Sequence, residues 1–181
     1  MLPFPTIESP QPKEPVCISK IGEVELIRRI RVWLGAASPD SPQGIGDDCA
    51  VHHPSPGRQQ LLTVDSVTWE QHFDKSVSAY DAGSKLAKRN LSDLAAMGAA
   101  PKVALLNILS GPDLSVDWLE NFVSGIRDIC LRYDLKVVGG DLSTLPKGLF
   151  TASMTLIGES EAEPLLRSTA RLGDHIYVTG S

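Results

Sequence analysis

Apolar residues recur every three or four positions in three segments of the chain, which is the spacing of an amphipathic helix. The first segment covers residues 19–34 and is followed by Gly35, a residue type that often ends helices. The second covers residues 78–97 and opens at Ser78 with a sequence resembling a capping box. The third begins at Ser115 and carries a continuous apolar stripe. This pattern predicts three helices.

Short apolar and β-branched runs lie between and after these segments, bounded by glycine, proline and serine. They predict strands, and the elements follow one another as helix, two strands, helix, strand, helix and three strands. Because helices and strands do not alternate regularly, this order predicts an α+β domain with the helices on one face of the sheet. The expected strands are residues 49–53, 61–67, 102–109, 135–138, 149–158 and 175–179.

The two ends of the chain differ from its middle. Residues 1–18 are rich in proline and lack an apolar run, which predicts a flexible lead and not a signal peptide. Residues 19–181 are enough for one well-buried domain and short for two. Because the chain stops two residues after an expected strand, with nothing to cap it, we expect a domain that is cut off and not one that ends naturally.

Composition excludes several classes of protein. The formal net charge is −5 and no basic run occurs, which argues against a nucleic-acid partner. No apolar run approaches the length of a membrane span. The three cysteines are odd in number and far apart, which favours free thiols in a reducing compartment over disulfides or a zinc site. We therefore expect a cytoplasmic protein.

Aspartates placed in turns and at the ends of apolar runs are the candidate chemistry. Asp47 and Asp48 stand side by side after the glycines of a tight turn, where their like charges favour a cation between them. Mg²⁺ takes oxygen ligands from a few carboxylates together with substrate phosphates, so it is the natural candidate. The further acids in similar settings are Asp65, Asp93 and Asp141.

Each of these residues also has an ordinary interpretation. A turn acid after glycine is common, and Asp93 could form an ion pair with Arg89 four residues earlier. Asp93 nevertheless lies near the end of its predicted helix, where the helix dipole disfavours a carboxylate, and a cation would remove that conflict. His72 and Arg167, taken alone, are more typical of surface positions. No Walker loop, G-x-G-x-x-G or kinase catalytic-loop pattern occurs.

The ordered series of motifs is more specific than any one of them. It closely resembles bacterial thiamine-monophosphate kinase, a family within the superfamily of aminoimidazole-ribonucleotide synthetase, over roughly residues 19–181. The resemblance implies that family's N-terminal domain, an α/β sandwich with a mixed, mostly antiparallel sheet, and it implies that the family's C-terminal domain is absent from this chain. The motifs, in order, are Gly44-Ile45-Gly46-Asp47-Asp48-Cys49-Ala50, Asp65 with His72-Phe73, Asn90-Leu91-Ser92-Asp93-Leu94-Ala95-Ala96-Met97-Gly98, Gly139-Gly140-Asp141, Leu166-Arg167-Ser168 and Gly173-Asp174-His175-Ile176-Tyr177-Val178-Thr179-Gly180.

The resemblance further implies ATP-dependent phosphorylation of thiamine monophosphate to thiamine diphosphate, in a homodimer whose two N-terminal domains form one barrel. Direct phosphoryl transfer assisted by Mg²⁺ needs no covalent nucleophile, so none is assigned. Val64 and Leu142 depart from the threonines usual in the family. The matching positions are Asp48, Thr63, Asp65, Asp93 and Asp141 with neighbouring Asp47 for metal, Gly139, Gly140 and Arg167 for ATP, and His72 for substrate.

Two other functions stay open. One is a sister activity of the same superfamily, such as selenophosphate synthesis, hydrogenase maturation or purine synthesis. The other is a non-catalytic dimerisation or nucleotide-binding module. If the resemblance holds, we expect the chain alone to bind Mg²⁺-nucleotide weakly and to lack turnover, because half of the site would be missing.

Overall fold

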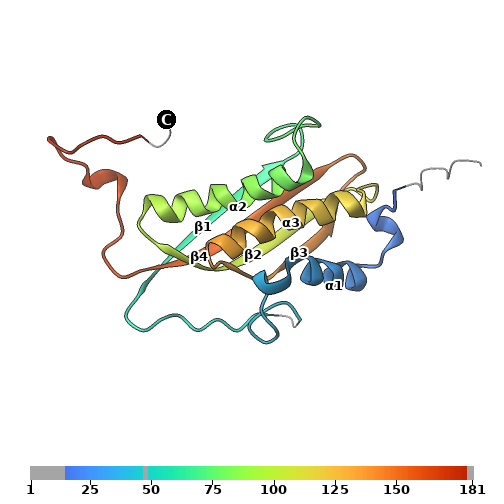
Figure 1. Ribbon diagram of the computed structural model, residues 1–181, viewed down its shortest axis with the longest axis horizontal. Coiled ribbons are helices and arrows are strands. Elements are labelled where there is room, and N and C mark those ends of the chain that lie inside the picture. The colour runs from blue at the N-terminus through green and yellow to red at the C-terminus, as the bar shows by residue number, and fades with distance from the viewer. Residues whose placement is uncertain (1–14, 47–48, 179–181) are drawn as a thin grey trace, which may run out of the picture.

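The computed structural model describes residues 15–46 and 49–178, which form one sheet with helices packed on one face (Figure 1). Strand β4 lies between β1 and β2 and is antiparallel to both, whereas β2 is parallel to the edge strand β3. The α+β class and the mixed, mostly antiparallel sheet are therefore confirmed. The strands are β1 (Gln59–Thr68), β2 (Ala100–Ser110), β3 (Lys136–Thr144) and β4 (Phe150–Ser160).

Local signals explain where the helices begin and end. The Ser78 and Ser115 side chains accept hydrogen bonds from backbone N–H groups in the first turns of the second and third helices, as their sequences predict. The first helix ends at Gly35, whose φ of 51° suits glycine. The helices are α1 (Glu23–Leu34), α2 (Ala79–Ala96) and α3 (Val116–Arg132), with short 3₁₀ turns at Ile18–Lys20, Gly35–Ala37 and Arg167–Thr169.

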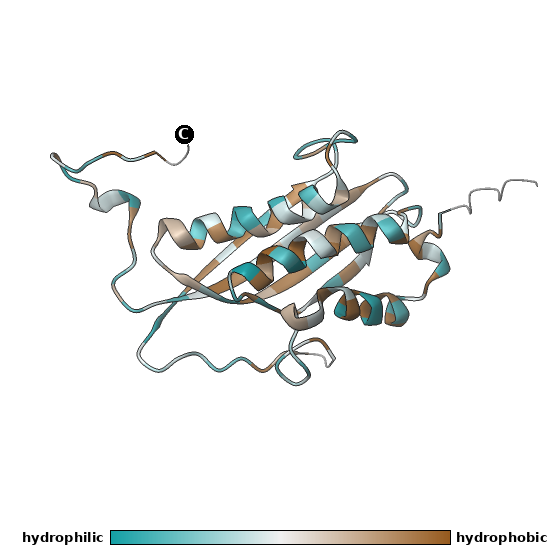
Figure 2. Ribbon diagram, in the orientation of Figure 1, coloured by the Kyte–Doolittle hydropathy of each residue, from teal (hydrophilic) through white to brown (hydrophobic). Residues whose placement is uncertain are grey.

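The two faces of the sheet have different environments. Leu61 and Val67 of β1 point toward the helices and are buried in the core. Side chains alternate along a strand, so Leu62 and Val64 point the other way, and they are 68% and 64% exposed. Leu105 of β2, also exposed, lies on the same open face between two buried neighbours. Figure 2 shows hydrophobic positions concentrated along the strands and on parts of the helices.

Three sequence-based expectations were wrong. Residues 49–53 and 175–178 form no strand, and the former are held by isolated contacts such as the hydrogen bond from the Val51 N–H to the Pro42 carbonyl. Gly139 and Gly140 were expected in a turn but lie inside β3, because pairing with β2 keeps the chain extended through them. A Cβ on Gly140 would come within 1.7 Å of the Leu106 carbonyl oxygen, so only glycine fits there.

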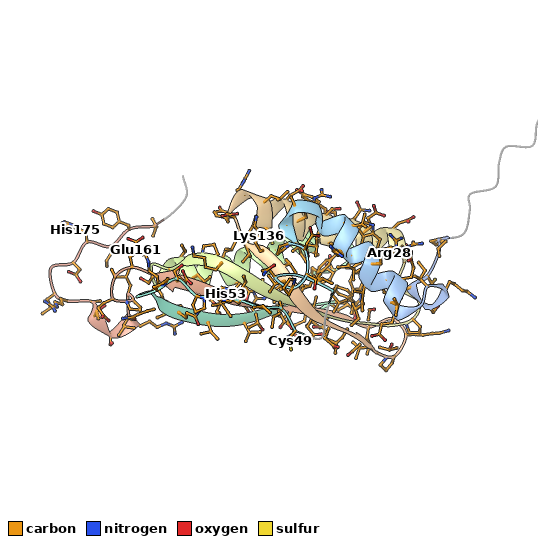
Figure 3. All side chains as sticks on the ribbon, turned by 90° about the horizontal axis from the view of Figure 1, so that it is seen from below. Arg28, Cys49, His53, Lys136, Glu161 and His175 are labelled. Atoms are coloured by element: carbon orange, nitrogen blue, oxygen red, sulfur yellow. The ribbon has the colours of Figure 1, made fainter. Side chains whose placement is uncertain are left out.

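The segment after β4 leads away from the domain. Figure 3 shows Glu161 and His175 at the end of the molecule opposite Arg28 of α1. The Leu165 N–H donates to the Met97 carbonyl, which ties the beginning of this segment to the end of α2. Residues 170–178 are exposed throughout.

Candidate functional site

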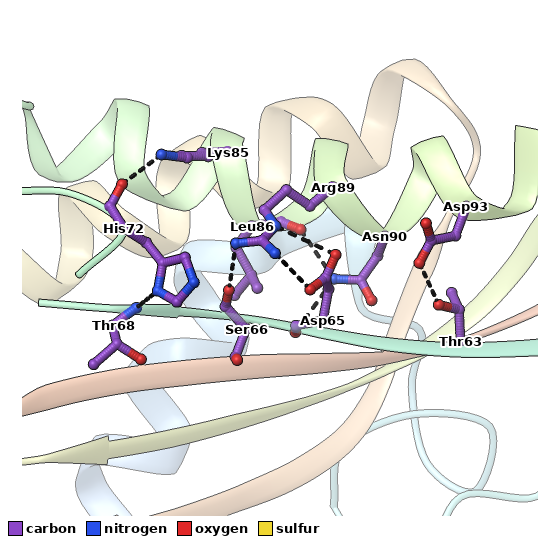
Figure 4. A network of polar contacts seen from close by, with 10 residues as sticks. All are labelled: Thr63, Asp65, Ser66, Thr68, His72, Lys85, Leu86, Arg89, Asn90 and Asp93. Carbon is purple, nitrogen blue, oxygen red and sulfur yellow. Dashed lines mark hydrogen bonds and ion pairs between the residues drawn. The ribbon is translucent and has the colours of Figure 1, made fainter. Parts of the chain in front are cut away.

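Four polar residues face one another between strand β1 and helix α2. Thr63 and Asp65 are two positions apart on β1, so both point toward the helix layer. Arg89 and Asp93 are four positions apart on α2, so both lie on the helix side that meets β1. Each strand residue pairs with one helix residue, as Figure 4 shows. The structure thus brings together Thr63, Asp65 and Asp93, and their role as ligands of one metal site stays a prediction.

Asp65 is bound by an arginine. The Arg89 Nη2 donates to Asp65 Oδ1 at 2.8 Å and its Nε donates to Oδ2 at 3.3 Å, which is a two-pronged contact. The Arg89 Nη1 also donates to the Ser66 carbonyl at 3.0 Å. The two side chains are 32% and 27% exposed, so solvent reaches the pair. An ion pair of this exposure stabilises a fold by roughly 1 kcal/mol or less.

Asp93 is held by a hydroxyl group. The Thr63 Oγ1 donates to Asp93 Oδ2 at 2.6 Å, a short charge-assisted hydrogen bond. Asp93 lies in the last turn of α2, where unpaired carbonyl groups give the helix end a partial negative charge. One hydroxyl donor offsets this conflict only partly, and Asp93 remains exposed. The alternative ion pair between Asp93 and Arg89 does not form, since Arg89 turns to Asp65.

An open cleft of about 580 Å³ runs along this contact. Positive and negative side chains line it in equal number, so it can take a mixed ligand such as a phosphate with a divalent cation. Its lining residues are Asp65, Asp81, Ser84, Lys85, Lys88, Arg89, Ser92 and Asp93.

His72 lies beyond the end of β1, on the same side of the sheet. Its Nδ1 accepts a hydrogen bond from the Thr68 N–H at 3.0 Å, which fixes the ring and places the proton of the neutral form on Nε2. The Lys85 ammonium donates to the His72 carbonyl and links this turn to α2. His72 can therefore present an oriented N–H group to a ligand.

Asp141 lies on the other face of the sheet. Its register partner is Asn107, and the neighbours of Asn107 on β2, Leu106 and Ile108, are buried against the helices. Asp141 is exposed and accepts a hydrogen bond from Ser143 at 2.6 Å. Within the described part of the chain, no three His, Cys, Asp or Glu residues come close enough to share a metal ion. Asp47 and Asp48 fall outside the described residues.

The residues expected to bind ATP are also dispersed. Gly139 and Gly140 lie in the edge strand β3, where close packing against β2 already explains the glycine at position 140. Arg167 opens an exposed 3₁₀ turn after β4 and is not among the residues that line the cleft. The structure thus brings together the β1 and α2 residues only.

The donor set of the cleft suits Mg²⁺. Thr63, Asp65 and Asp93 offer a hydroxyl and two carboxylates, the hard oxygen ligands that this ion prefers. The present partner of Asp65 is the Arg89 guanidinium, a positive group that a divalent cation can replace. Sequence reasoning did not assign Arg89 to the site and considered it a possible ion-pair partner of Asp93. Its spacing of four residues from Asp93 was the available signal.

A second polar contact positions the chain that leads into β1. Glu159 of β4 is buried, and its Oε1 accepts a hydrogen bond from the Ser55 N–H at 2.9 Å. The Lys102 ammonium lies 3.8 Å from the other carboxylate oxygen. The hydrogen bond from Ser55 holds the pKa of Glu159 below its ordinary value. Glu159 therefore anchors the segment between the glycine-rich turn and β1.

The family model of the AIR synthase related protein, N-terminal domain, matches residues 46–160, well over half of the chain. The chain belongs to this family. Within the described ranges, no helix has the length and apolar character needed to cross a membrane.

Relatives of this domain include thiamine-monophosphate kinases. The enzyme of Escherichia coli strain K12 is 37% identical over 161 residues, covering 88% of this chain and 48% of that protein. The thiamine-monophosphate kinase structure from Stenotrophomonas maltophilia K279a is 36% identical with a TM-score of 0.68, covering 82% and 46%. The structure of AaThiL complexed with AMPPCP and TMP is 34% identical with a TM-score of 0.62, covering 86% and 47%. The chain spans about half the length of the curated relatives it matches.

Proposed function

We propose that this chain is the N-terminal, Mg²⁺- and nucleotide-binding part of a thiamine-monophosphate kinase, which transfers the γ-phosphoryl group of ATP to thiamine monophosphate. The observation that carries the proposal is the 37% identity to thiamine-monophosphate kinase over 88% of the chain. A structure of similar fold that is complexed with AMPPCP and TMP supports the two substrates. A sister activity of the superfamily has no observation of comparable weight in its favour.

The cleft between β1 and α2 offers what phosphoryl transfer needs. This reaction depends on positioning and on neutralising the charge of the transferred group, and it needs no nucleophile from the protein. Thr63, Asp65 and Asp93 would hold Mg²⁺, which when bound shields the phosphate charge. Lys85 and Arg89 add positive charge beside that site. His72, whose Nδ1 accepts from the Thr68 N–H, offers an oriented ring N–H from the turn after β1 that Lys85 links to α2.

The open face of the sheet is the proposed homodimer surface. Leu62, Val64 and Leu105 expose apolar side chains there, whereas the opposite face carries the hydrophobic core. A second copy of this face would cover these side chains and remove them from water. The resemblance to a family whose N-terminal domains pair through their sheets supports the second copy as the occupant.

Calorimetry with the 181-residue chain tests the binding half of the proposal. The chain should bind AMPPCP in the presence of Mg²⁺ and lose this binding when EDTA is added. Asp93→Asn keeps the shape of the side chain but removes its charge, so it should weaken Mg²⁺-dependent binding at least about tenfold. Nucleotide binding that ignores both Mg²⁺ and Asp93 would contradict the proposed site.

A chimera tests the catalytic half. This chain should replace the corresponding N-terminal part of the Escherichia coli enzyme and support release of ADP that depends on thiamine monophosphate. The same chimera with Asp93→Asn is the control and should be inactive. The 181-residue chain alone should show no turnover, because orientation of two substrates contributes roughly 7–11 kcal/mol in well-aligned cases and half of the relatives' length is not in it.

A further inference from the structure

The guanidinium group of Arg89 occupies the position where a cation would meet Asp65. It contacts both carboxylate oxygens, at 2.8 and 3.3 Å, so neither oxygen is free for a metal on that side. Among the residues that the structure describes, the neighbouring Asp93 is bound by a neutral hydroxyl alone. The two carboxylates of the cleft are therefore unequal, since one is already neutralised by a charged group of the protein.

Arg89 makes a second hydrogen bond, which would remain if its contact with Asp65 were broken. Its Nη1 donates to the Ser66 carbonyl at 3.0 Å, independently of the carboxylate. If a divalent cation takes Asp65, the guanidinium can turn about this contact and keep its place beside the cleft. Its freed N–H groups would then face the cleft, where phosphate oxygens are good acceptors for a planar, charged fork.

We propose that Arg89 makes Asp65 bind a divalent cation only weakly on its own and more tightly when a phosphate ligand arrives with it. Free cation must displace Arg89 without offering it a new partner. A cation bound to a nucleotide phosphate brings that partner, so the lost ion pair is replaced. Arg89 is thus a specificity-determining residue that favours the Mg²⁺-nucleotide complex over the bare ion. This inference rests on the proposed function of the cleft.

Lys88 provides a matched control. It lies next to Arg89 on α2, lines the same cleft and carries the same charge. Within the described part of the chain it forms no ion pair, so Lys88→Met removes one charge from the cleft without freeing Asp65. Comparing Arg89→Met with Lys88→Met separates the specific contact from the general electrostatic field.

The first arm measures cation binding without nucleotide. Mn²⁺ suits the same carboxylate ligands as Mg²⁺, and electron paramagnetic resonance counts the free ion during a titration of the 181-residue chain. Arg89→Met should bind Mn²⁺ about three- to fivefold more tightly than the unchanged chain, the factor expected for freeing a partly exposed ion-pair partner. Lys88→Met should gain less than about twofold.

The second arm measures AMPPCP affinity by calorimetry at saturating Mg²⁺. Arg89→Met should bind the nucleotide about five- to tenfold more weakly, because the phosphate loses its fork of donors. Lys88→Met should weaken it less, because it removes only the general field of one positive charge from the cleft. A variant that binds the cation more tightly but the nucleotide more weakly is the result expected if Arg89 exchanges Asp65 for a phosphate. An ion pair with a purely structural role would not change the two affinities in opposite directions. If Arg89→Met fails to fold by circular dichroism, Arg89→Gln replaces it in both arms.

Cation affinity that is unchanged or weaker in Arg89→Met would overturn the inference, and so would equal gains in Arg89→Met and Lys88→Met. Either result leaves the proposed function standing if the chimera turns over thiamine monophosphate. Conversely, the chimera could be inactive while Arg89→Met still binds Mn²⁺ more tightly and AMPPCP more weakly. That result would contradict the kinase assignment and leave Arg89 as the counter-ion of Asp65.

Discussion

Replacing Gly83 by alanine should force helices α2 and α3 apart. A Cβ on Gly83 would lie 1.9 Å from the Phe122 carbonyl oxygen, and one on Gly125 would lie 2.0 Å from the Tyr80 carbonyl oxygen. Ordinary contact begins near 3.4 Å, so the shortfall at Gly83 is 3.4 − 1.9 = 1.5 Å. Both obstacles are backbone atoms of the facing helix, which cannot rotate out of the way as a side chain can.

The size of the effect follows from two opposing contributions. Overpacking a well-packed core costs about 1–3 kcal/mol, and a backbone obstacle places this change at the upper end. Alanine in a helix interior is favoured over glycine by about 1 kcal/mol, which offsets part of the cost. The net loss is about 2 kcal/mol, equivalent to a fall in melting temperature of about 4–8 °C for a chain of this size.

Thermal unfolding followed by circular dichroism measures this loss. Glu120→Ala, on the exposed side of α3, is the control and should change stability by less than about 0.5 kcal/mol. Gly125→Ala should repeat the loss, because its clash is the mirror of the first. A melting temperature for Gly83→Ala at or above that of the unchanged chain would refute the reasoning, since helix propensity would then outweigh a contact that the structure says cannot be tolerated.

Three further predictions concern the open face of the sheet, the buried carboxylate of Glu159 and the buried thiol of Cys130. If the chain forms the proposed dimer, Val64→Glu should convert it to a monomer in sedimentation velocity, whereas Val24→Glu, at an 83% exposed position of α1, should not. Equal behaviour of the two variants would argue against the open face as the dimer surface. The folded-state pKa of Glu159 is lowered, so its stabilising contribution is present above the ordinary value of 4.5 and is lost as pH falls below it. The urea midpoint of Glu159→Gln should therefore drop less between pH 6 and pH 4 than that of the unchanged chain, and identical drops would contradict this. Burial raises the pKa of the Cys130 thiol to about 12, so a thiol reagent at pH 8 should leave Cys130 unmodified in the folded chain and modify it in urea. Rapid labelling of Cys130 without denaturant would be inconsistent with its burial.

The helices were predictable because their signals are local. The serine caps and the apolar spacing of α2 and α3 lie within the segments themselves, and both helices begin where the sequence indicates. Strands depend on partners that the sequence does not show. Residues 49–53 and 175–178 resemble strands but pair with none, whereas β3 continues through two glycines because β2 runs beside it.

The candidate site also has a part that the sequence predicts and a part that only the packing of helix on strand decides. Strand alternation and helical spacing are enough to bring Thr63 and Asp65 opposite Asp93 once α2 packs on β1. The role of Arg89 depends on the rotation of α2 about its axis, which places its guanidinium beside Asp65 and not over Asp93. Spacing alone allowed both partners, so only the packed structure decides between them.

The position of Asp141 decides whether it can share a cation with Asp65 and Asp93 within one copy of the chain. In one copy, the sheet lies between Asp141 on the open face and the cleft that holds Asp65 and Asp93. Asp141 therefore cannot help the cleft to hold a cation in a monomer. In the monomeric Val64→Glu background, Asp141→Asn should leave Mn²⁺ affinity within about twofold, whereas Asp93→Asn should weaken it at least about tenfold. Equal losses for the two variants would show that Asp141 reaches the cleft within a single copy, which the register of β3 with β2 does not allow.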